Sequence, residues 1–143
     1  MKITQISIFL ENRKGRLFEA CSLLGSNGIN IRALTIAETE DFGVLRIVVD
    51  KTDDAVKCLR ENNFVANITD VVAVEVSDKP GGLASVLKKL SENNINIEYM
   101  YGFMEKFSDN ALLVFRFEDV NAAQKVLTNN NIKIVTKDEI KGL

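Results

Sequence analysis

The sequence predicts an α+β fold that consists of two copies of one βαββαβ unit. The first observation is a repeated phrase, because NGINIRAL at residues 27–34 reads almost the same as NNINIEYM at residues 93–100. The second is the extent of the match, since residues 15–31 agree with residues 81–97 at seven of seventeen positions. The third is that strand-like and helix-like patterns follow in the same order in both copies. We therefore expect two domains, the first repeat at 1–69 and the second repeat at 70–143.

Each repeat opens with a predicted strand and a predicted helix. Residues 3–11 and 70–78 alternate apolar and polar side chains, which is typical of a strand with one buried face. Amphipathic helices are predicted next, over 15–28 and 81–94. Their apolar residues fall at i, i+3, i+4 and i+7, at Leu17, Ala20, Cys21 and Leu24 in the first repeat and at Leu83, Val86, Leu87 and Leu90 in the second. Gly28 and Asn94 tolerate the left-handed conformation that ends a helix.

The remaining elements complete the same order twice. Second strands are predicted at 29–38 and 95–103, third strands at 43–50 and 111–118, short helices at about 53–62 and 119–130, and final strands at about 64–69 and 132–136. With right-handed crossovers, βαββαβ gives a four-stranded antiparallel sheet with two helices on one face. This is the ferredoxin-like arrangement, and it is expected in each repeat.

The composition favours a folded protein in the cytoplasm. Of the 143 residues, 46% are hydrophobic and 27% are charged, so the chain can bury a core. The net charge is −2, which argues against general attraction to nucleic acid or to an anionic membrane. No apolar run approaches the roughly 20 residues that cross a bilayer, and the N-terminus does not read as a signal peptide.

Catalysis, a bound metal and RNA binding have little support in the sequence. The chain has no His and no C-x-x-C, so His-metal and thiol–imidazole chemistry are excluded, and no metal or cofactor is expected. Glu38, Glu40 and Asp41 cluster where a β-hairpin turn belongs, so we interpret them as a solvated turn. Phe115 and Phe117 are expected to face the helices, whereas RNA-binding sheets expose such aromatics. We therefore expect no enzyme.

The loop before the first helix of each repeat is the candidate ligand site. Residues 11–17 (ENRKGRL) and 77–83 (SDKPGGL) are polar and place a Gly at the same position, where the backbone can approach a ligand closely. A helix start offers unpaired N–H groups and a partial positive charge, which suit a carboxylate. Asn12 and Asp78 could accept hydrogen bonds from an ammonium group, as an α-amino acid requires. They could equally be helix caps.

These stretches resemble the signature of ACT domains, the small-molecule-binding regulatory modules of amino-acid metabolism. The pattern is a polar residue, two further residues, Gly, one residue, Leu, an amphipathic helix and G-I-N-I; both repeats show it, over about 1–69 and 70–143. The whole chain is similar to stand-alone tandem ACT proteins of bacteria, in which DFGVLR and IEYMYGF recur. The resemblance implies a non-catalytic, amino-acid-binding regulatory or sensor protein. Its implied partners are a free amino acid or similar metabolite, a second copy of the chain, and a separate metabolic enzyme.

The resemblance also implies where the ligand binds. In well-studied members two ACT domains pair side by side, the effector binds at the interface between them, and each domain lends the Asn of G-I-N-I to the loop of the other. One implied site joins Asn12, Arg13, Lys14, Gly15, Arg16 and Leu17 to Asn96 and Ile97. The other joins Asp78, Lys79, Pro80, Gly81, Gly82 and Leu83 to Asn30 and Ile31. For Asn30 and Asn96, hydrogen bonding at a strand edge or a turn is the alternative.

The two implied sites should differ from each other. The first loop is basic and has Lys14 where the second has Pro80, so it would favour a more anionic ligand or be vestigial. Asp78 would make the second site better for an α-ammonium group. Specificity would come from residues near the interface, for which the candidates are Leu34, Ala37, Phe42, Tyr99, Tyr101 and Phe103. The alternative function is a regulatory or structural subunit that docks on a separate enzyme without binding a small ligand.

Overall fold

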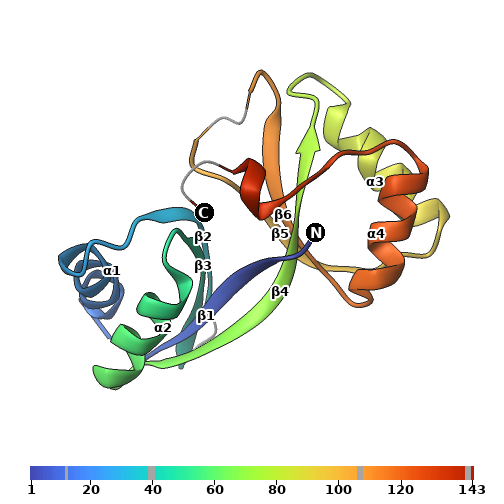
Figure 1. The fold of residues 1–143 in the computed structure, drawn as a ribbon. Coiled ribbons are helices and arrows are strands. Elements are labelled where there is room, and N and C mark those ends of the chain that lie inside the picture. The colour runs from blue at the N-terminus through green and yellow to red at the C-terminus, as the bar shows by residue number, and fades with distance from the viewer. Residues whose placement is uncertain (12, 39–40, 106–107, 141–142) are drawn as a thin grey trace. The chain divides into compact units, whose positions relative to one another are not determined.

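The computed structural model describes residues 1–11, 13–38, 41–105, 108–140 and 143 (Figure 1). Contacts between Cα atoms divide the chain into two compact units. Of the described residues, the N-terminal unit holds Thr4–Thr69 and Leu143, and the C-terminal unit holds Met1–Ile3 and Asp70–Ile140.

The N-terminal unit has the predicted βαββαβ order. Its elements are β1 (Ile3–Glu11), α1 (Arg16–Ser26), β2 (Ile31–Glu38), β3 (Phe42–Val49), α2 (Thr52–Glu61) and the first part of β4 (Val65–Val76). The strands lie in the order β2-β3-β1-β4, and β3 is antiparallel to both β1 and β2. This order is that of the ferredoxin-like arrangement, because the right-handed crossover from β1 to β2 leaves room for β3 between them.

The C-terminal unit repeats this order. After the second part of β4 come α3 (Gly82–Glu92), β5 (Ile97–Gly102), β6 (Ala111–Phe117), α4 (Val120–Asn129), β7 (Ile134–Val135) and a 3-10 helix, η1 (Lys137–Glu139). β6 lies between β5 and β4, and β7 pairs with the other edge of β4. β7 therefore takes the place that the first part of β4 has in the N-terminal unit.

The predicted break between the repeats does not exist in the secondary structure. The strands expected at 64–69 and 70–78 are one strand, β4, which runs from Val65 to Val76. This stretch contains no Gly or Pro, so nothing in it interrupts an extended backbone. The last strand also differs from the prediction, because β7 has two residues where five were expected.

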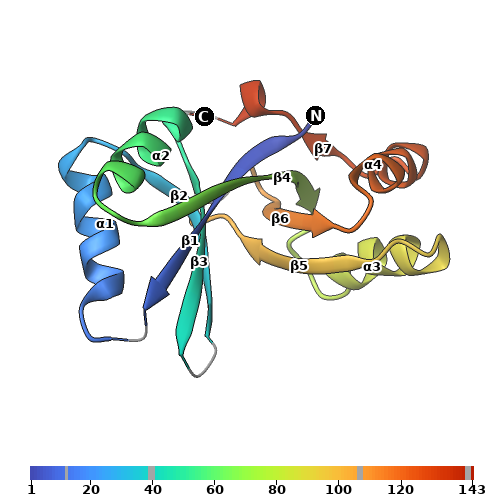
Figure 2. The same ribbon diagram turned by 90° about the horizontal axis from the view of Figure 1, so that it is seen from below.

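A core lies between the strands and the two helices of each unit. In the N-terminal unit, Ile6, Ile8 and Leu10 of β1 alternate toward α1 and α2, where they pack with Leu24 and Leu59. Figures 1 and 2 show both helices of a unit on the same face of its strands. The alternation along β1 is therefore the two-residue period of a strand with one face on the core.

The core of the C-terminal unit contains the two phenylalanines that could otherwise have contacted RNA. Phe115 and Phe117 are fully buried, and their rings stack with centroids 5.5 Å apart. They pack in one cluster with Leu90 of α3 and Leu127 of α4. The prediction that both rings face the helices is confirmed, so neither ring is available to stack on a base.

The four α-helices in the described part of the chain end with the same hydrogen-bonding pattern. An Asn at the C-cap donates its Nδ2 to the carbonyl four residues earlier, at 2.8 Å in Asn27, Asn62, Asn93 and Asn130. The next residue has a positive φ, in Gly28, Asn63, Asn94 and Asn131. An apolar residue then donates its N–H back into the last turn, as Ile29 does to the Leu24 carbonyl at 3.0 Å. This is the hydrogen bonding of a Schellman motif, and the predicted stops at Gly28 and Asn94 are confirmed.

The first apolar residue of each predicted helical stripe is not part of the core. Leu17 and Leu83 are exposed and Cys21 is half-buried, whereas Leu24 and Leu90 are buried. The stripe therefore begins outside the core, beside the candidate loops. None of the helices in the described ranges has the length and apolar character of a membrane span.

Candidate ligand-binding site

The loops before α1 and α3 share one backbone geometry. Gly15 and Gly81 are the N-cap residues of the two helices, with φ of 84° and 82°. A residue with a side chain rarely adopts this left-handed conformation, so each loop depends on its glycine. In both loops, the residue two positions before the glycine donates its N–H to the carbonyl two residues earlier. Arg13 donates to Glu11 at 2.8 Å, and Lys79 donates to Ser77 at 3.0 Å.

The start of α1 leaves N–H groups open. Both N-cap residues are glycines, so neither has a side chain of its own that could cap its helix. Capping of α3 by Asp78 stays a prediction, and Asn12 lies outside the described residues. The N–H groups of Leu17 and Phe18 in α1 have no acceptor among the described residues. Such groups, at the positive end of the helix dipole, can accept a carboxylate.

The two loops differ at the position after the glycine. Gly82 is buried, and a Cβ on it would overlap the carbonyl oxygen of Ser77. Arg16 occupies this position in the first repeat, so the first loop has to leave room for a side chain. Its closing hydrogen bond is correspondingly longer, at 3.4 Å from the Arg16 N–H to the Arg13 carbonyl, against 3.0 Å from Gly82 to Lys79.

The first loop carries a pair of arginines joined by one carboxylate. Glu19 accepts from Arg13 at 3.3 and 3.4 Å and from Arg16 at 3.0 Å. Arg13 also lies 3.7 Å from Glu11, through its Nε. The hydrogen bond from Arg16, together with the charge of Arg13, holds the pKa of the Glu19 carboxyl below its usual value.

Arg16 is held in place beneath the loop. Its side chain is 13% exposed, and its guanidinium lies over the ring of Phe64, 3.9 Å from the centroid. This is the geometry of a cation–π contact. The Arg16 Nε is buried without a hydrogen-bond partner in the part of the chain that is described. Arg16 is thus a fixed positive group, whereas the side chain of Arg13 is 52% exposed.

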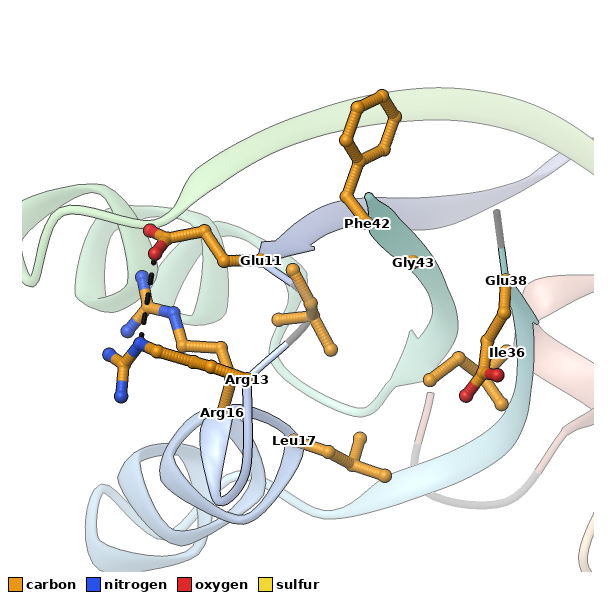
Figure 3. Close-up of a pocket in the computed structure, with 9 residues that line it drawn as sticks. Glu11, Arg13, Arg16, Leu17, Ile36, Glu38, Phe42 and Gly43 are labelled. Atoms are coloured by element: carbon orange, nitrogen blue, oxygen red, sulfur yellow. Dashed lines mark ion pairs between the residues drawn. The ribbon is translucent and has the colours of Figure 1, made fainter. Parts of the chain in front are cut away.

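A pocket of about 120 Å³ opens beside this loop, within the N-terminal unit. It is lined by Leu10, Glu11, Arg13, Arg16, Leu17, Ile36, Glu38, Phe42 and Gly43. Figure 3 shows Arg13 and Arg16 extending to one side of the start of α1, near Glu11, while Leu17 projects toward Ile36 of β2. The pocket therefore has a charged end and an apolar wall.

The asparagines of G-I-N-I tie neighbouring strands together. Asn30 exchanges hydrogen bonds with Asp50, from its N–H to Oδ1 at 2.9 Å and from the Asp50 N–H to its carbonyl at 3.2 Å. Asn96 accepts from the Glu118 N–H at 3.2 Å and donates its Nδ2 to the Glu118 carboxylate at 3.2 Å. Both asparagines are exposed, and both precede a strand irregularity at the same point. Bonding at the strand edge, the alternative stated above, is thus present in both.

Several residues of the two implied sites do not line this pocket. Asp78, Lys79, Pro80 and Gly81 are exposed in the loop before α3, and Leu83 follows in the first turn. Asn96 and Ile97 line a shallow depression of about 510 Å³ at the end of α3, with Leu87, Leu90, Ser91, Asn94 and Ile95. Ile31 is half-buried against the core of the N-terminal unit. The pairing of each loop with the G-I-N-I residues of the other repeat stays a prediction.

Several pocket residues were not among the predicted site residues. Leu10, Glu11 and Gly43 lie at strand ends, and Ile36 and Glu38 lie on β2, so their approach to the loop depends on strand register. Leu10 pairs with Gly43, and Gly43 pairs with Glu38. The one sequence feature that could have pointed to these pocket residues is the apolar Ile36, which lies on an edge strand. Phe42 had been named as a specificity candidate.

In the described ranges no group of three or more His, Cys, Asp or Glu side chains could hold a metal ion.

Comparison with known proteins gives the family. The family model described as "ACT domain pair" matches residues 1–143. A crystal structure of protein BT0572 from Bacteroides thetaiotaomicron is 40% identical, with a TM-score of 0.90 over 97% of this chain and 95% of that one. The ligand-free regulatory subunit of aspartate kinase from Thermus thermophilus shares the fold, with 16% identity and a TM-score of 0.62 over 88% of this chain and 90% of that one.

A curated relative matches part of the chain. The acetolactate synthase small subunit of Buchnera aphidicola subsp. Baizongia pistaciae is 31% identical over 80 residues, which are 55% of this chain and 50% of that protein. The chain thus matches about half the length of that relative. With two βαββαβ units, two glycine-capped loops and a family model that matches its whole length, the chain belongs to the ACT domain pair family.

Proposed function

We propose that the chain is a non-catalytic regulatory protein that binds a free amino acid at the loops before α1 and α3. The observation that carries the proposal is the loop geometry that both repeats share. Gly15 and Gly81 start the two helices in the same left-handed conformation, and neither N-cap residue has a side chain of its own to cap the N–H groups that follow. A backbone turn of this kind presents donors to a carboxylate without a positively charged side chain.

The rest of an α-amino acid also finds suitable groups. Asp78 in the second loop is an exposed carboxylate, and Glu11 and Glu38 line the pocket beside the first loop. Carboxylates accept hydrogen bonds from an ammonium group. The first loop, with Arg13, Lys14 and Arg16, favours a ligand with more negative character than the second loop does.

The relatives support a regulatory role in trans. One is named a small subunit of acetolactate synthase, and another structure with this fold is a regulatory subunit of aspartate kinase. A protein of this kind acts on a separate catalytic subunit. We include such an enzyme among the partners of this chain, and we place the protein in the cytoplasm, where amino-acid metabolism occurs.

The alternative is a docking subunit without a small ligand, and one observation favours it. Large apolar side chains are exposed on α1 and on the edge strand β2: Phe18 is 73% exposed, and Leu17, Leu34 and Ile36 are also exposed. Exposed apolar groups that lie on neighbouring elements mark interaction surfaces. A second copy of the chain or a catalytic subunit would cover them, so a homodimer is part of the proposal. Light scattering of the purified chain gives its oligomeric state.

Thermal unfolding of the full chain with each of the twenty amino acids at millimolar concentration tests the proposal, with calorimetric titration of each hit. A ligand at a hundredfold excess over its Kd stabilises the folded state by about 2.7 kcal/mol. That corresponds to a rise in Tm of several degrees in a chain of this size. One clear hit supports amino-acid sensing. A folded chain that responds to none of the twenty favours the docking subunit.

A further inference from the structure

The first part of β4, residues 65–69, is an edge of the N-terminal unit. The strand order gives β1 as its neighbour on one side. Among the strand pairs of the described residues, β6 and β7 meet β4 only in its second part, at residues 72–76 and 73–74. An edge strand presents backbone N–H and C=O groups with which another strand can pair. Residues 65–69 are therefore a possible template for strand addition.

The side chains of this edge favour such pairing. Residues 65–69 read VANIT, with three β-branched side chains and no charge, Gly or Pro. Val65 and Ile68 are 59% and 60% exposed. Ile68 also lines a depression of about 490 Å³ on the unit surface, together with Asp53, Val56, Lys57, Arg60 and Glu61 of α2. An exposed apolar edge of this kind is a site at which chains associate unless the fold protects it.

Arg60, in the last turn of α2, is bonded to the backbone of this edge. Its Nε and Nη2 both donate to the Ala66 carbonyl, at 3.1 and 2.9 Å. A carbonyl enclosed between β4 and β1 would be bonded to β1, so two donors from one guanidinium indicate that this carbonyl lies on the free edge. Alternate residues of an antiparallel strand share an edge, so the N–H of Ile68 lies on that edge as well.

The second repeat has no equivalent of this arginine and no equivalent edge. When residues 55–64 are aligned with 123–132, Thr128 stands at the position of Arg60. The strand that follows, β7, has two residues, and both Ile134 and Val135 are buried. A very short edge strand offers too few backbone groups to pair with another strand. The arginine is thus present in the repeat whose last strand is long and exposed.

We propose that Arg60 guards the free edge of β4 and prevents a second copy of the chain from pairing there. An incoming strand has to displace the guanidinium from the Ala66 carbonyl, and it would then bury a positive charge that has lost its acceptor. Association is thereby directed to other surfaces of the chain. This role does not depend on an amino-acid ligand. The alternative is that Arg60, a basic residue in the last turn, only stabilises the end of α2.

Sedimentation velocity of the full chain over a range of concentrations tests the guard. Arg60 is exposed and alanine is a strong helix former, so Arg60→Ala is expected to fold. This variant should self-associate about tenfold more tightly than the wild type, which is the effect of roughly one additional hydrogen bond between strands. Lys57→Ala is the matched control, because it removes a positive charge from the same helix and the same depression. It should associate as the wild type does.

A double variant and hydrogen exchange locate the association. In Arg60→Ala, the N–H of Ile68 should exchange more slowly as the concentration rises. Arg60→Ala combined with Ile68→Lys should associate only as the wild type does, because a charge on an edge strand opposes pairing. If Arg60→Ala is less stable than the wild type but associates no more tightly, Arg60 only stabilises α2 and the guard is wrong. If Ile68→Lys does not reverse the association, the chains meet at another surface, and the guard is wrong as well.

Discussion

Gly15 and Gly81 adopt nearly the same backbone conformation, with φ of 84° and 82°, although they are sixty-six residues apart and follow different side chains. Lys14 precedes the first and Pro80 precedes the second. The shared element is thus the left-handed turn at the start of each helix, while the side chains around it have diverged. A protein with two unequal ligand sites requires this combination of a repeated backbone turn and different side chains around it.

Substitution of either left-handed glycine should destabilise the fold, whereas substitution of a glycine inside a helix should not. A Cβ at Gly15 or Gly81 would meet no neighbouring atom within 4 Å, so the cost of Gly→Ala there comes from the positive φ alone. We expect Gly15→Ala and Gly81→Ala each to lower the free energy of unfolding by about 1 kcal/mol. Gly25→Ala, inside α1 and equally unobstructed, should raise it by roughly 0.5–1 kcal/mol. Urea unfolding of the three variants gives these differences, and equal signs for Gly15 and Gly25 would contradict them.

Gly82 should tolerate substitution least of the loop residues. A Cβ there would overlap the carbonyl oxygen of Ser77, which is backbone and cannot rotate away. Gly82→Ala should therefore cost about 2 kcal/mol or more, as overpacking of a closed site does. Gly102→Ala is the control, because a Cβ at Gly102 makes an ordinary contact with Leu113. Equal urea unfolding midpoints for Gly82→Ala and Gly102→Ala would show that the loop can open.

The ion pair at the C-terminal end should give a defined pH response. The hydrogen bond from Lys133, at 3.0 Å, and that from the Thr136 backbone lower the pKa of the Glu139 carboxyl below 4.5. A lowered folded-state pKa means that the stabilisation is complete above about pH 4.5 and is lost as the pH falls through the folded value. Glu139 in turn raises the pKa of Lys133 above 10.5, so that part of the stabilisation is present below pH 10.5 and is lost as the pH rises through the folded value.

A titration followed by NMR measures the first of these shifts. The Glu139 carboxyl carbon should titrate below pH 4.5 in the wild type and closer to 4.5 in Lys133→Gln. Lys88→Gln removes a lysine that pairs with Glu92 instead, and it should leave the Glu139 titration unchanged. A Glu139 pKa that is the same in Lys133→Gln as in the wild type would mean that the ion pair does not form in solution.

The two thiols should react slowly in the folded protein. Burial raises the pKa of Cys58, with a further contribution from Glu61, and burial raises the pKa of Cys21. The thiolate is the reactive form, so a raised pKa lowers the rate of exchange with an aromatic disulfide reagent. At pH 8 both should react much more slowly than in urea, and Cys58 should be the slower because it is buried whereas Cys21 is half-buried. Native rates equal to those in urea would refute this.

Much of the fold follows from patterns that depend on neighbouring residues. The helix stops at Gly28 and Asn94, the buried pair Phe115 and Phe117, and the two sets of βαββαβ elements need only local periodicity and turn residues. The single long strand β4 was missed, because a boundary between repeats was placed where the repeat pattern changes. No Gly or Pro marks that boundary, so the backbone continues extended through Thr69 and Asp70.

The site was predictable only in part, for a related reason. The loop glycines carry a local signal, and so do the basic residues of the first loop. The bridge from Glu19 to both arginines depends on rotamers, and the packing of Arg16 on Phe64 joins residues forty-eight positions apart. The contribution of Ile36 and Glu38 to the pocket depends on how β2 and β3 pair. Apart from the i,i+3 spacing of Arg16 and Glu19, these relations have no signature in the sequence.

The most direct test of the account is an NMR titration of the full chain with the amino acid that binds best, followed through backbone amide shifts. The account predicts the largest changes at the N–H groups of residues 13–18 and 79–84, at the starts of α1 and α3, with smaller changes elsewhere. Saturable changes confined to other parts of the chain, with residues 13–18 and 79–84 unaffected, would contradict the proposal that the glycine-capped loops hold the ligand.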